Sequence, residues 1–183
     1  MSSFSFVIRD GLERDVAPCM ALDSAYETDY VWQMSTQHTT EHHQVLFKTE
    51  HLPRSMEVNY PLDENKMRLC LAPEQCFLVA IGKDDPTVLG YLTMWHIPVS
   101  QTAIIQDIVV DSNVRRSHMG ARLVNIAKRW AKEHQVTYLQ LVTQTKNYPS
   151  IVFAQNLGFS FCGYNDQHFT NQDIAVFFGQ ILR

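Results

Sequence analysis

Two arginines and a glycine stand close together between residues 111 and 121, and their spacing suits the binding of an anion. The segment lies between an expected strand and the first turn of an amphipathic helix, where unpaired backbone amides point outward and favour negative charge. Arg115 and Arg116 can reach phosphate oxygens, and Gly120 lets the backbone approach a ligand closely. The segment therefore predicts a pyrophosphate site.

A plainer interpretation of this segment stays open. In it, the two arginines are solvated and Gly120 only allows the helix to pack against the sheet. The loop matches neither the Walker pattern nor the glycine pattern of dinucleotide-binding folds, which disfavours the common nucleotides. The segment alone does not decide between the two interpretations.

The elements that must position this loop form a sheet with an antiparallel start. Apolar runs bounded by turn residues predict strands at residues 5–9, 77–81, 88–97 and 103–110. A helix that carries Val16, Met20 and Leu22 follows the first strand. The later three strands follow one another with short turns, which is typical of an antiparallel meander.

The second half of the chain predicts a parallel connection. Apolar residues recur at helical spacing from Met119 to Trp130, and residues 137–143 form a strand parallel to 103–110 if the two share a sheet. Asn147 caps a further helix, with Pro149 in its first turn and Gly158 past its end, before a hairpin of residues 159–164 and 174–178. We expect an α/β fold of the α+β type: a mixed, mostly antiparallel sheet with one central parallel βαβ pair and helices on both faces.

The N-terminal part is less regular. Aromatic residues alternate with acids between residues 23 and 32, and a strand is predicted at residues 45–47. This composition suits a cage for a cationic ligand, and it suits equally a helix or loop packed by its aromatics. The residues that such a cage would use are Tyr26, Glu27, Asp29, Tyr30 and Trp32.

Composition limits the classes of function. The chain has 183 residues and a net charge of −4, which suits one domain without a basic nucleic-acid footprint. Its four cysteines form no Cys-x-x-Cys pair, so we expect reduced, mostly buried thiols, with Cys162 in the core. Neither a signal peptide nor a membrane-spanning run is expected, and the predicted location is cytoplasmic.

Four histidines, His38, His42, His43 and His51, lie in an otherwise polar stretch. No aspartate or cysteine completes a recognisable set of ligands with them, so we expect a solvated face and no metal site.

Two motifs in the second half resemble the signatures of the GNAT acetyltransferases. Arg115 and Gly120 match the first and last positions of Arg/Gln-x-x-Gly-x-Gly/Ala. Asn147, Phe153 and the Gly158-Phe159 pair match Asn-x-x-Ala-x-x-Phe-Tyr-x-x-x-Gly-Phe. The resemblance covers roughly residues 75–180, so we expect one domain, residues 1–183, in which residues 75–180 carry coenzyme binding and residues 1–74 are an acceptor-side elaboration.

The resemblance implies acetyl-CoA as co-substrate and direct transfer of its acetyl group to an amine. The strand before the loop would offer backbone groups to the pantetheine arm, the loop would hold the pyrophosphate, and the second motif would complete the site. The implied coenzyme-binding residues are Ile108, Val109, Val110, Arg115, Arg116, Ser117, His118, Met119, Gly120, Ala121, Asn147 and Phe153.

Two departures from the family pattern affect chemistry. His118 stands where the first glycine of the loop is expected, and Ala154 stands where many members have a tyrosine that protonates the leaving thiolate. Tyr148 is a candidate acid and Asp107 a candidate base, although the sequence is equally consistent with a surface or strand-pairing role for Asp107. A catalytically impaired acyl-CoA-binding module is therefore the alternative to an active enzyme.

A finer resemblance, to streptothricin acetyltransferases, is carried by residues 26–32, 163–166 and 174–178. It implies a small or medium-sized cationic amine as acceptor, such as a streptothricin-like antibiotic, and thus a role in antibiotic resistance. No nucleic-acid or membrane partner is expected, and pairing of exposed strands into a homodimer is left open.

Overall fold

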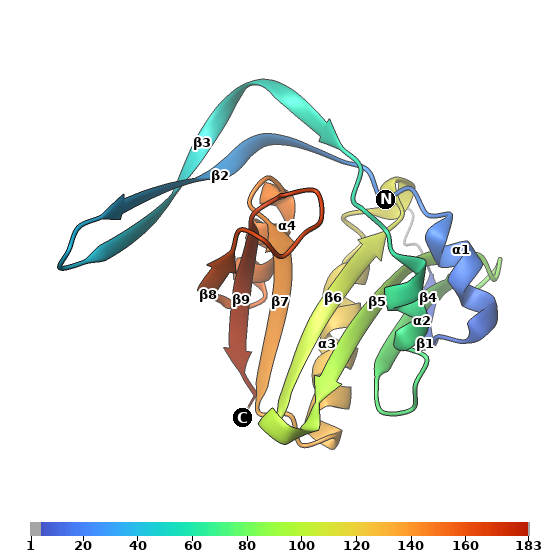
Figure 1. Ribbon diagram of the computed structural model, residues 1–183. Coiled ribbons are helices and arrows are strands. Elements are labelled where there is room, and N and C mark those ends of the chain that lie inside the picture. The colour runs from blue at the N-terminus through green and yellow to red at the C-terminus, as the bar shows by residue number, and fades with distance from the viewer. Residues whose placement is uncertain (1–4, 183) are drawn as a thin grey trace.

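The structure is a computed structural model that describes residues 5–182; positions 1–4 and 183, at the two ends of the predicted domain, lie outside the described residues. Its main sheet has seven strands in the order β1-β4-β5-β6-β7-β9-β8, mixed and mostly antiparallel, with β6 and β7 as the parallel pair (Figure 1). These strands are β1 (Phe6–Asp10), β4 (Cys76–Gly82), β5 (Val88–Ile97), β6 (Thr102–Val110), β7 (Tyr138–Gln144), β8 (Ser160–Asn165) and β9 (Ala175–Ile181). The expected fold class is confirmed.

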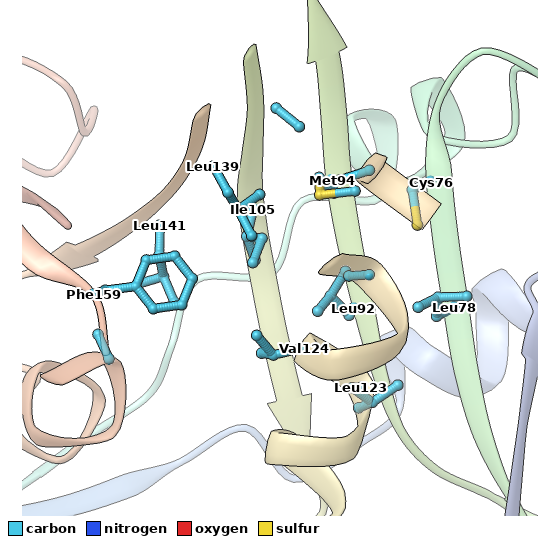
Figure 2. Packing of buried hydrophobic residues seen from close by; sticks show 14 of the residues in the cluster. Cys76, Leu78, Leu92, Met94, Ile105, Leu123, Val124, Leu139, Leu141 and Phe159 are labelled. Carbon is cyan, nitrogen blue, oxygen red and sulfur yellow. The ribbon is translucent and has the colours of Figure 1, made fainter. Parts of the chain in front are cut away.

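Helices cover both faces of this sheet. The long helix α3 (Met119–Glu133) and α4 (Tyr148–Asn156) pack on one face, and the short helices α1 (Val16–Met20) and α2 (Glu64–Leu69) pack on the other. Figure 2 shows Leu92, Met94 and Ile105 of the sheet beside Leu123 and Val124 of α3. Neighbouring β4 residues alternate between these layers, because successive side chains of a strand point to opposite faces.

The region between residues 26 and 58 is a separate two-stranded hairpin of β2 (Tyr26–His38) and β3 (His43–Val58). It arches over the end of the sheet beside α4, and its tip projects beyond β8 (Figure 1). The Trp32 backbone N–H donates to the Thr145 carbonyl at 2.9 Å and ties the hairpin to the end of β7. The helix-or-loop interpretation of residues 26–32 is therefore wrong, and the strand predicted at 45–47 is much longer.

Other sequence-based boundaries hold with small differences. Helix α1 ends at Met20, so Leu22 lies beyond it. The Asn147 side chain caps α4 by accepting from the Ser150 N–H at 3.1 Å, and Gly158 follows this helix with a φ of 81°. Among residues 5–182, no helix is long and apolar enough to cross a membrane.

All four cysteines are free, and three of them are buried. Burial raises the pKa of the Cys76 thiol to about 12, which keeps it protonated and inert. Cys162 is exposed, so its predicted place in the core is wrong. The reason is that β8 is an edge strand and most of its residues face solvent.

The parallel strands part within the sheet. β6 pairs with β7 only from Thr102 to Ile105, after which β7 continues beside β9 and β6 beside β5. The β5–β6 register shifts at the same level, between Thr93 and Met94, so Gln106 has no partner in this ladder. Such a bulge bends its strand and increases the local twist, which favours separation of the two parallel strands beyond Ile105.

Candidate active site

A cavity of about 220 Å³ lies where β6 and β7 part. Its wall comes from β6, β7, the start of α3, the first turns of α4 and two N-terminal segments. The lining residues are Ser24, Tyr26, Tyr60, Ile105, Gln106, Ile108, Val109, Val110, Arg115, Gly120, Leu141, Val142, Thr143, Asn147, Pro149, Ser150 and Phe153. The two GNAT-like motifs thus meet at one cavity, together with residues from the N-terminal part.

Arg115 fastens the loop to the N-terminal part of the chain. Its Nε donates to the Val110 carbonyl at 3.0 Å, and its Nη2 donates to the Asp23 carbonyl at 3.1 Å. Its Nη1 donates to the Ala25 carbonyl, directly before β2. Most of the N–H donors of this guanidinium are therefore used by backbone carbonyls, so Arg115 joins the loop to residues 23–25.

The rest of the loop is shaped for close approach by a ligand. Arg116 and His118 both have a φ of 61°, in the left-handed region that favours glycine. His118 is the N-cap of α3 and makes no side-chain capping hydrogen bond, while the Ser117 Oγ is buried without a partner among residues 5–182. His118 thus keeps the turn that the family's glycine would make, at a cost of about 1 kcal/mol or more.

Gly120 lies close to the Phe153 ring beside the cavity. A Cβ at Gly120 would lie 3.3 Å from the ring atoms Cε2 and Cζ of Phe153. The Met119 side chain is buried in the core, so at that position only backbone can meet a ligand. The contact between Gly120 and Phe153 closes one side of the cavity.

Asp107 is held by two hydroxyl groups. The Tyr60 hydroxyl donates to Asp107 Oδ1 at 2.7 Å, and Thr93 Oγ1 donates to Oδ2 at 2.9 Å. No lysine, arginine or histidine of residues 5–182 forms an ion pair with this carboxylate. Burial raises the pKa of Asp107, and the two hydroxyls oppose that shift only in part.

A second polar group lies in β7. Thr143 is 2% exposed, lines the cavity, and its Oγ1 has no hydrogen-bond partner in the described part of the chain. An unpaired buried hydroxyl is costly, so a cavity ligand that could pair with it would gain affinity.

The residues expected to form an aromatic cage are divided by the structure. Tyr26 lines the cavity and lies 3.5 Å from the buried Gln144, oxygen to oxygen. Tyr30 contacts the rings of His51 and Tyr148, with centroids 5.0 and 5.4 Å away. Tyr148 itself does not line the cavity.

Trp32 packs in an aromatic cluster with Phe47, Phe161 and Phe178. Glu27 and Asp29 are exposed, and the Ser55 hydroxyl donates to Asp29. Of the expected cage, only Tyr26 reaches the cavity.

The histidines of the polar stretch lie on the hairpin and are exposed. The Nδ1 atoms of His38 and His43 are 2.6 Å apart near its tip. In the part of the chain that the structure describes, no group of three or more His, Cys, Asp or Glu side chains is placed to hold a metal ion.

The cavity wall contains part of the expected coenzyme-binding set and residues that were not expected. Of the coenzyme-binding set, the cavity brings together Ile108, Val109, Val110, Arg115, Gly120, Asn147 and Phe153, and it leaves Arg116, Ser117, His118, Met119 and Ala121 outside its wall. Sequence reasoning missed Tyr60 and Thr143 altogether. Tyr60 lies between β3 and α2, far from both motifs, and only the fold brings it to β6.

Comparison with known proteins agrees with this geometry. The family model described as "Acetyltransferase (GNAT) family" matches residues 31–159. Among curated proteins, no sequence matches this chain.

Solved structures share the whole fold. A nourseothricin acetyltransferase has a TM-score of 0.84 and 20% identity over 97% of this chain and 99% of its own. A protein described as a streptothricin acetyltransferase, from Bacillus anthracis str. Ames and in complex with acetyl coenzyme A, has a TM-score of 0.77 and 22% identity over 97% and 99%. The ribosomal-protein-S18-alanine N-acetyltransferase of Escherichia coli has a TM-score of 0.68 and 12% identity over 97% and 94%. The family match over most of the chain, together with two motifs that meet at one cavity, places this chain in the GNAT family of acetyltransferases.

Proposed function

We propose that this chain transfers the acetyl group of acetyl-CoA to a primary amine of a small or medium-sized cationic acceptor, by direct attack in a ternary complex. One observation carries the proposal. The cavity reaches from Gly120 and Asn147, beside the loop and α4, to Tyr26 and Tyr60 on the N-terminal side. Two substrates that enter from these two sides would meet between the parted strands, and such juxtaposition supplies much of the acceleration in a bimolecular transfer.

The coenzyme would be bound mainly through backbone. The N-terminal amides of α3 and the buried Ser117 hydroxyl would face the pyrophosphate, and Arg116 would add charge. Ile108, Val109 and Val110 would contact the pantetheine arm along β6, and the Asn147 amide nitrogen remains available because the oxygen caps α4. The relative that carries acetyl coenzyme A supports this choice of co-substrate. No metal is required.

The chemistry needs a neutral amine and a stabilised oxyanion. The ammonium loses a proton toward Asp107, its nitrogen attacks the thioester carbon, and the carbon–sulfur bond breaks to release the thiolate. A backbone amide of β6 near the bulge would bind the carbonyl oxygen as charge develops. Tyr148 is the proposed donor to the thiolate; its ring lies against Tyr30, and it follows Asn147, which lines the cavity.

The acceptor would be cationic because Glu27 and Asp29, on the strand of the cavity-lining Tyr26, form no ion pair within residues 5–182. Glu27 and Asp29 are exposed, so they would attract the acceptor at a distance rather than grip it. Tyr26 would contact the acceptor directly, with Tyr30 and Trp32 supporting the hairpin. The names of two structural relatives point to streptothricin-type amines and thus to antibiotic resistance. The buried free thiols suit a cytoplasmic enzyme.

The test is acetyl transfer by the purified protein. Release of coenzyme A thiol and mass gain of the acceptor would be followed with streptothricin-like, polyamine and aminoglycoside amines, with peptide N-termini as the contrasting class. Glu27→Gln should raise the acceptor KM at low salt and leave the acetyl-CoA KM unchanged, since exposed charges act on one substrate and are screened by salt. Acetylation of peptide termini alone, with Glu27→Gln like the parent, would refute the acceptor assignment.

Ala154 favours one second candidate, an acyl-CoA-binding module without turnover. Ala154 is fully buried and offers no hydroxyl where many family members have one. Calorimetric binding of acetyl-CoA without thiol release for any amine would support this candidate. Arg116→Ala should weaken coenzyme binding and reduce the salt dependence of that binding, whichever candidate is correct. A separate measurement of the molecular mass of the purified parent in solution would test whether the protein is a homodimer.

A further inference from the structure

We infer that Tyr60 is a catalytic residue: its hydroxyl accepts the proton of the acceptor's ammonium group while passing its own proton to Asp107. This inference rests on the proposed function, and it assigns a role to a residue that neither motif contains. The acceptor would then touch Tyr60 and never the carboxylate itself.

The first step of the argument is position. Tyr60 lines the cavity and Asp107 does not, yet the two are joined by a hydrogen bond of 2.7 Å from the Tyr60 hydroxyl to Oδ1. The hydroxyl also lies 3.3 Å from the Gln106 carbonyl. Because a hydroxyl has one proton and two lone pairs, donation to Asp107 leaves Tyr60 able to accept a hydrogen bond from a ligand.

The second step is rigidity. The Ser24 hydroxyl donates to the Tyr60 carbonyl at 3.1 Å, and Pro61 restricts the backbone of the residue before it to extended conformations. The Tyr60 ring packs against the hydrophobic cluster beneath α1 and α2. A relay needs its groups to stay within hydrogen-bond distance, and these contacts keep the phenol beside Asp107.

The third step is electrostatics. Burial and the nearby Asp107 charge raise the pKa of Tyr60 well above its ordinary value, so this residue relays a proton and does not ionise. Burial also raises the pKa of Asp107, which makes it a better proton acceptor than an exposed carboxylate. The other titratable groups that act on this pair are Lys66, which lowers the pKa of Asp107, and Asp63, Tyr91, Tyr26 and Cys70.

The proton balance of the step is simple. An N–H bond of the ammonium breaks and an O–H bond to Tyr60 forms, while the original Tyr60 O–H breaks and the Asp107 carboxylate becomes a carboxylic acid. Tyr60 ends the step unchanged, and the neutral amine keeps the electron pair that attacks the thioester. Attack on the thioester leaves the nitrogen positively charged, so it loses a second proton as the carbon–sulfur bond breaks. That second proton balances the one taken up by the leaving thiolate, and the Asp107 proton returns to solvent.

The experiment compares Tyr60→Phe with Tyr91→Phe in the full chain, with the acceptor that the parent acetylates best. Tyr91 is a buried tyrosine near Asp107 that does not line the cavity, so its variant controls for loss of a phenol in this region. We expect Tyr60→Phe to lower kcat about 100-fold or more, with unchanged acetyl-CoA affinity and Tyr91→Phe close to the parent. In the parent, the hydrogen bond from Tyr60 lowers the pKa of Asp107. Its loss in Tyr60→Phe should raise that pKa and move the acidic limb of the pH–rate profile to higher pH.

The outcomes separate the two proposals. A parent that acetylates no amine overturns the proposed function and the relay with it. An active parent with kcat and pH profile unaffected by Tyr60→Phe overturns the relay alone, and so does a loss of kcat without movement of the acidic limb, because packing damage would give that result. If Tyr60→Phe does not fold, kcat of the parent in mixtures of light and heavy water decides: a two-proton relay gives a curved dependence, and a linear one overturns it.

Discussion

Two aspartates, one beside the edge strand β1 and one on the central strand β6, have opposite environments. Asp15, beside β1, accepts from Arg9 Nη1 at 2.7 Å, from Arg9 Nη2 at 2.8 Å and from the Leu12 N–H at 2.8 Å. The Arg9 hydrogen bonds hold the pKa of Asp15 below its ordinary value. Asp107, on β6, has two neutral hydroxyl donors instead, and burial raises its pKa.

The difference shows how one residue type serves two purposes. A carboxylate paired bidentately with arginine stays charged over the whole physiological range, so it stabilises a turn and exchanges no proton. A carboxylate held only by hydroxyls changes charge more easily, at some cost to stability. We therefore expect Asp15 to matter for folding and Asp107 for chemistry.

The largest effect is expected for Asp107→Asn. It keeps the shape of the side chain and removes the proton acceptor, so kcat/KM for the acceptor should fall by about 10²- to 10⁴-fold. The measurement is steady-state thiol release, with acetyl-CoA affinity by calorimetry as the control for an intact coenzyme site. Activity within threefold of the parent would return Asp107 to a strand-pairing role.

Asp15→Asn should show the opposite pattern. It breaks a bidentate pair whose acid is only 5% exposed, and we expect the free energy of unfolding to fall by about 2 kcal/mol. The kcat of the folded fraction should not change, because Arg9 and Asp15 lie outside the cavity wall. Urea unfolding measures the free energy of unfolding. The steady-state rate divided by the concentration of folded enzyme gives kcat, and a large loss of kcat in a fully folded variant would contradict the comparison.

The pH dependence of stability should differ in sign between the two variants. The pKa of Asp15 is lowered on folding, so its stabilisation is present above the unfolded-state pKa and is lost as pH falls. The pKa of Asp107 is raised on folding, so its favourable contribution exists at low pH and is lost as pH rises through the folded-state value. At neutral pH, the Asp15→Asn variant should thus be less stable than the parent. The Asp107→Asn variant should compare more favourably with the parent at neutral pH than at acid pH.

Both differences should shrink toward acid pH. Urea unfolding of the parent and the two variants between acid and neutral pH measures them. Parallel pH curves for the two variants would contradict the assignment of opposite environments.

The sequence predicted the parts of this molecule that local chemistry determines. The strands at 77–81 and 88–97 follow from apolar runs, and Asn147 and Gly158 mark the ends of α4 because capping is local. The contact of Tyr60 with Asp107 joins residues 47 positions apart, and no periodicity reports it. The hairpin of β2 and β3 was predicted only at residues 45–47, because most residues of its outer half are exposed and no alternating apolar pattern marks its two strands.

The same limit applied to the loop. The family pattern expects glycine at position 118, and the backbone there does adopt a φ of 61°. The histidine accepts this conformation because the surrounding strand and helix impose it. His118 therefore differs from the family pattern in its side chain and not in its backbone conformation, and the motif alone could not predict this.

The smallest effect, and the finest form of the comparison, concerns two buried threonines. Thr93 is bonded to Asp107, whereas the Thr143 hydroxyl has no partner among the described residues although it lines the cavity. Thr143→Val keeps the shape and removes the unpaired hydroxyl, so the free protein should be stabilised by up to about 1 kcal/mol. If the coenzyme pairs with this hydroxyl, the same change should weaken acetyl-CoA binding about fivefold, since one neutral hydrogen bond contributes about 1 kcal/mol.

Urea unfolding without ligand and calorimetry with acetyl-CoA measure these two opposite shifts on the same variant. Thr93→Val is the matched control, because it removes a hydroxyl that is already satisfied and should destabilise the free protein instead. If Thr143→Val gains stability without losing coenzyme affinity, the hydroxyl is a cost of the fold that no coenzyme atom relieves. If both threonine variants lose the same stability, the Thr143 hydroxyl has a hydrogen-bond partner within the protein. The difference between the two aspartates then has no counterpart in these two threonines.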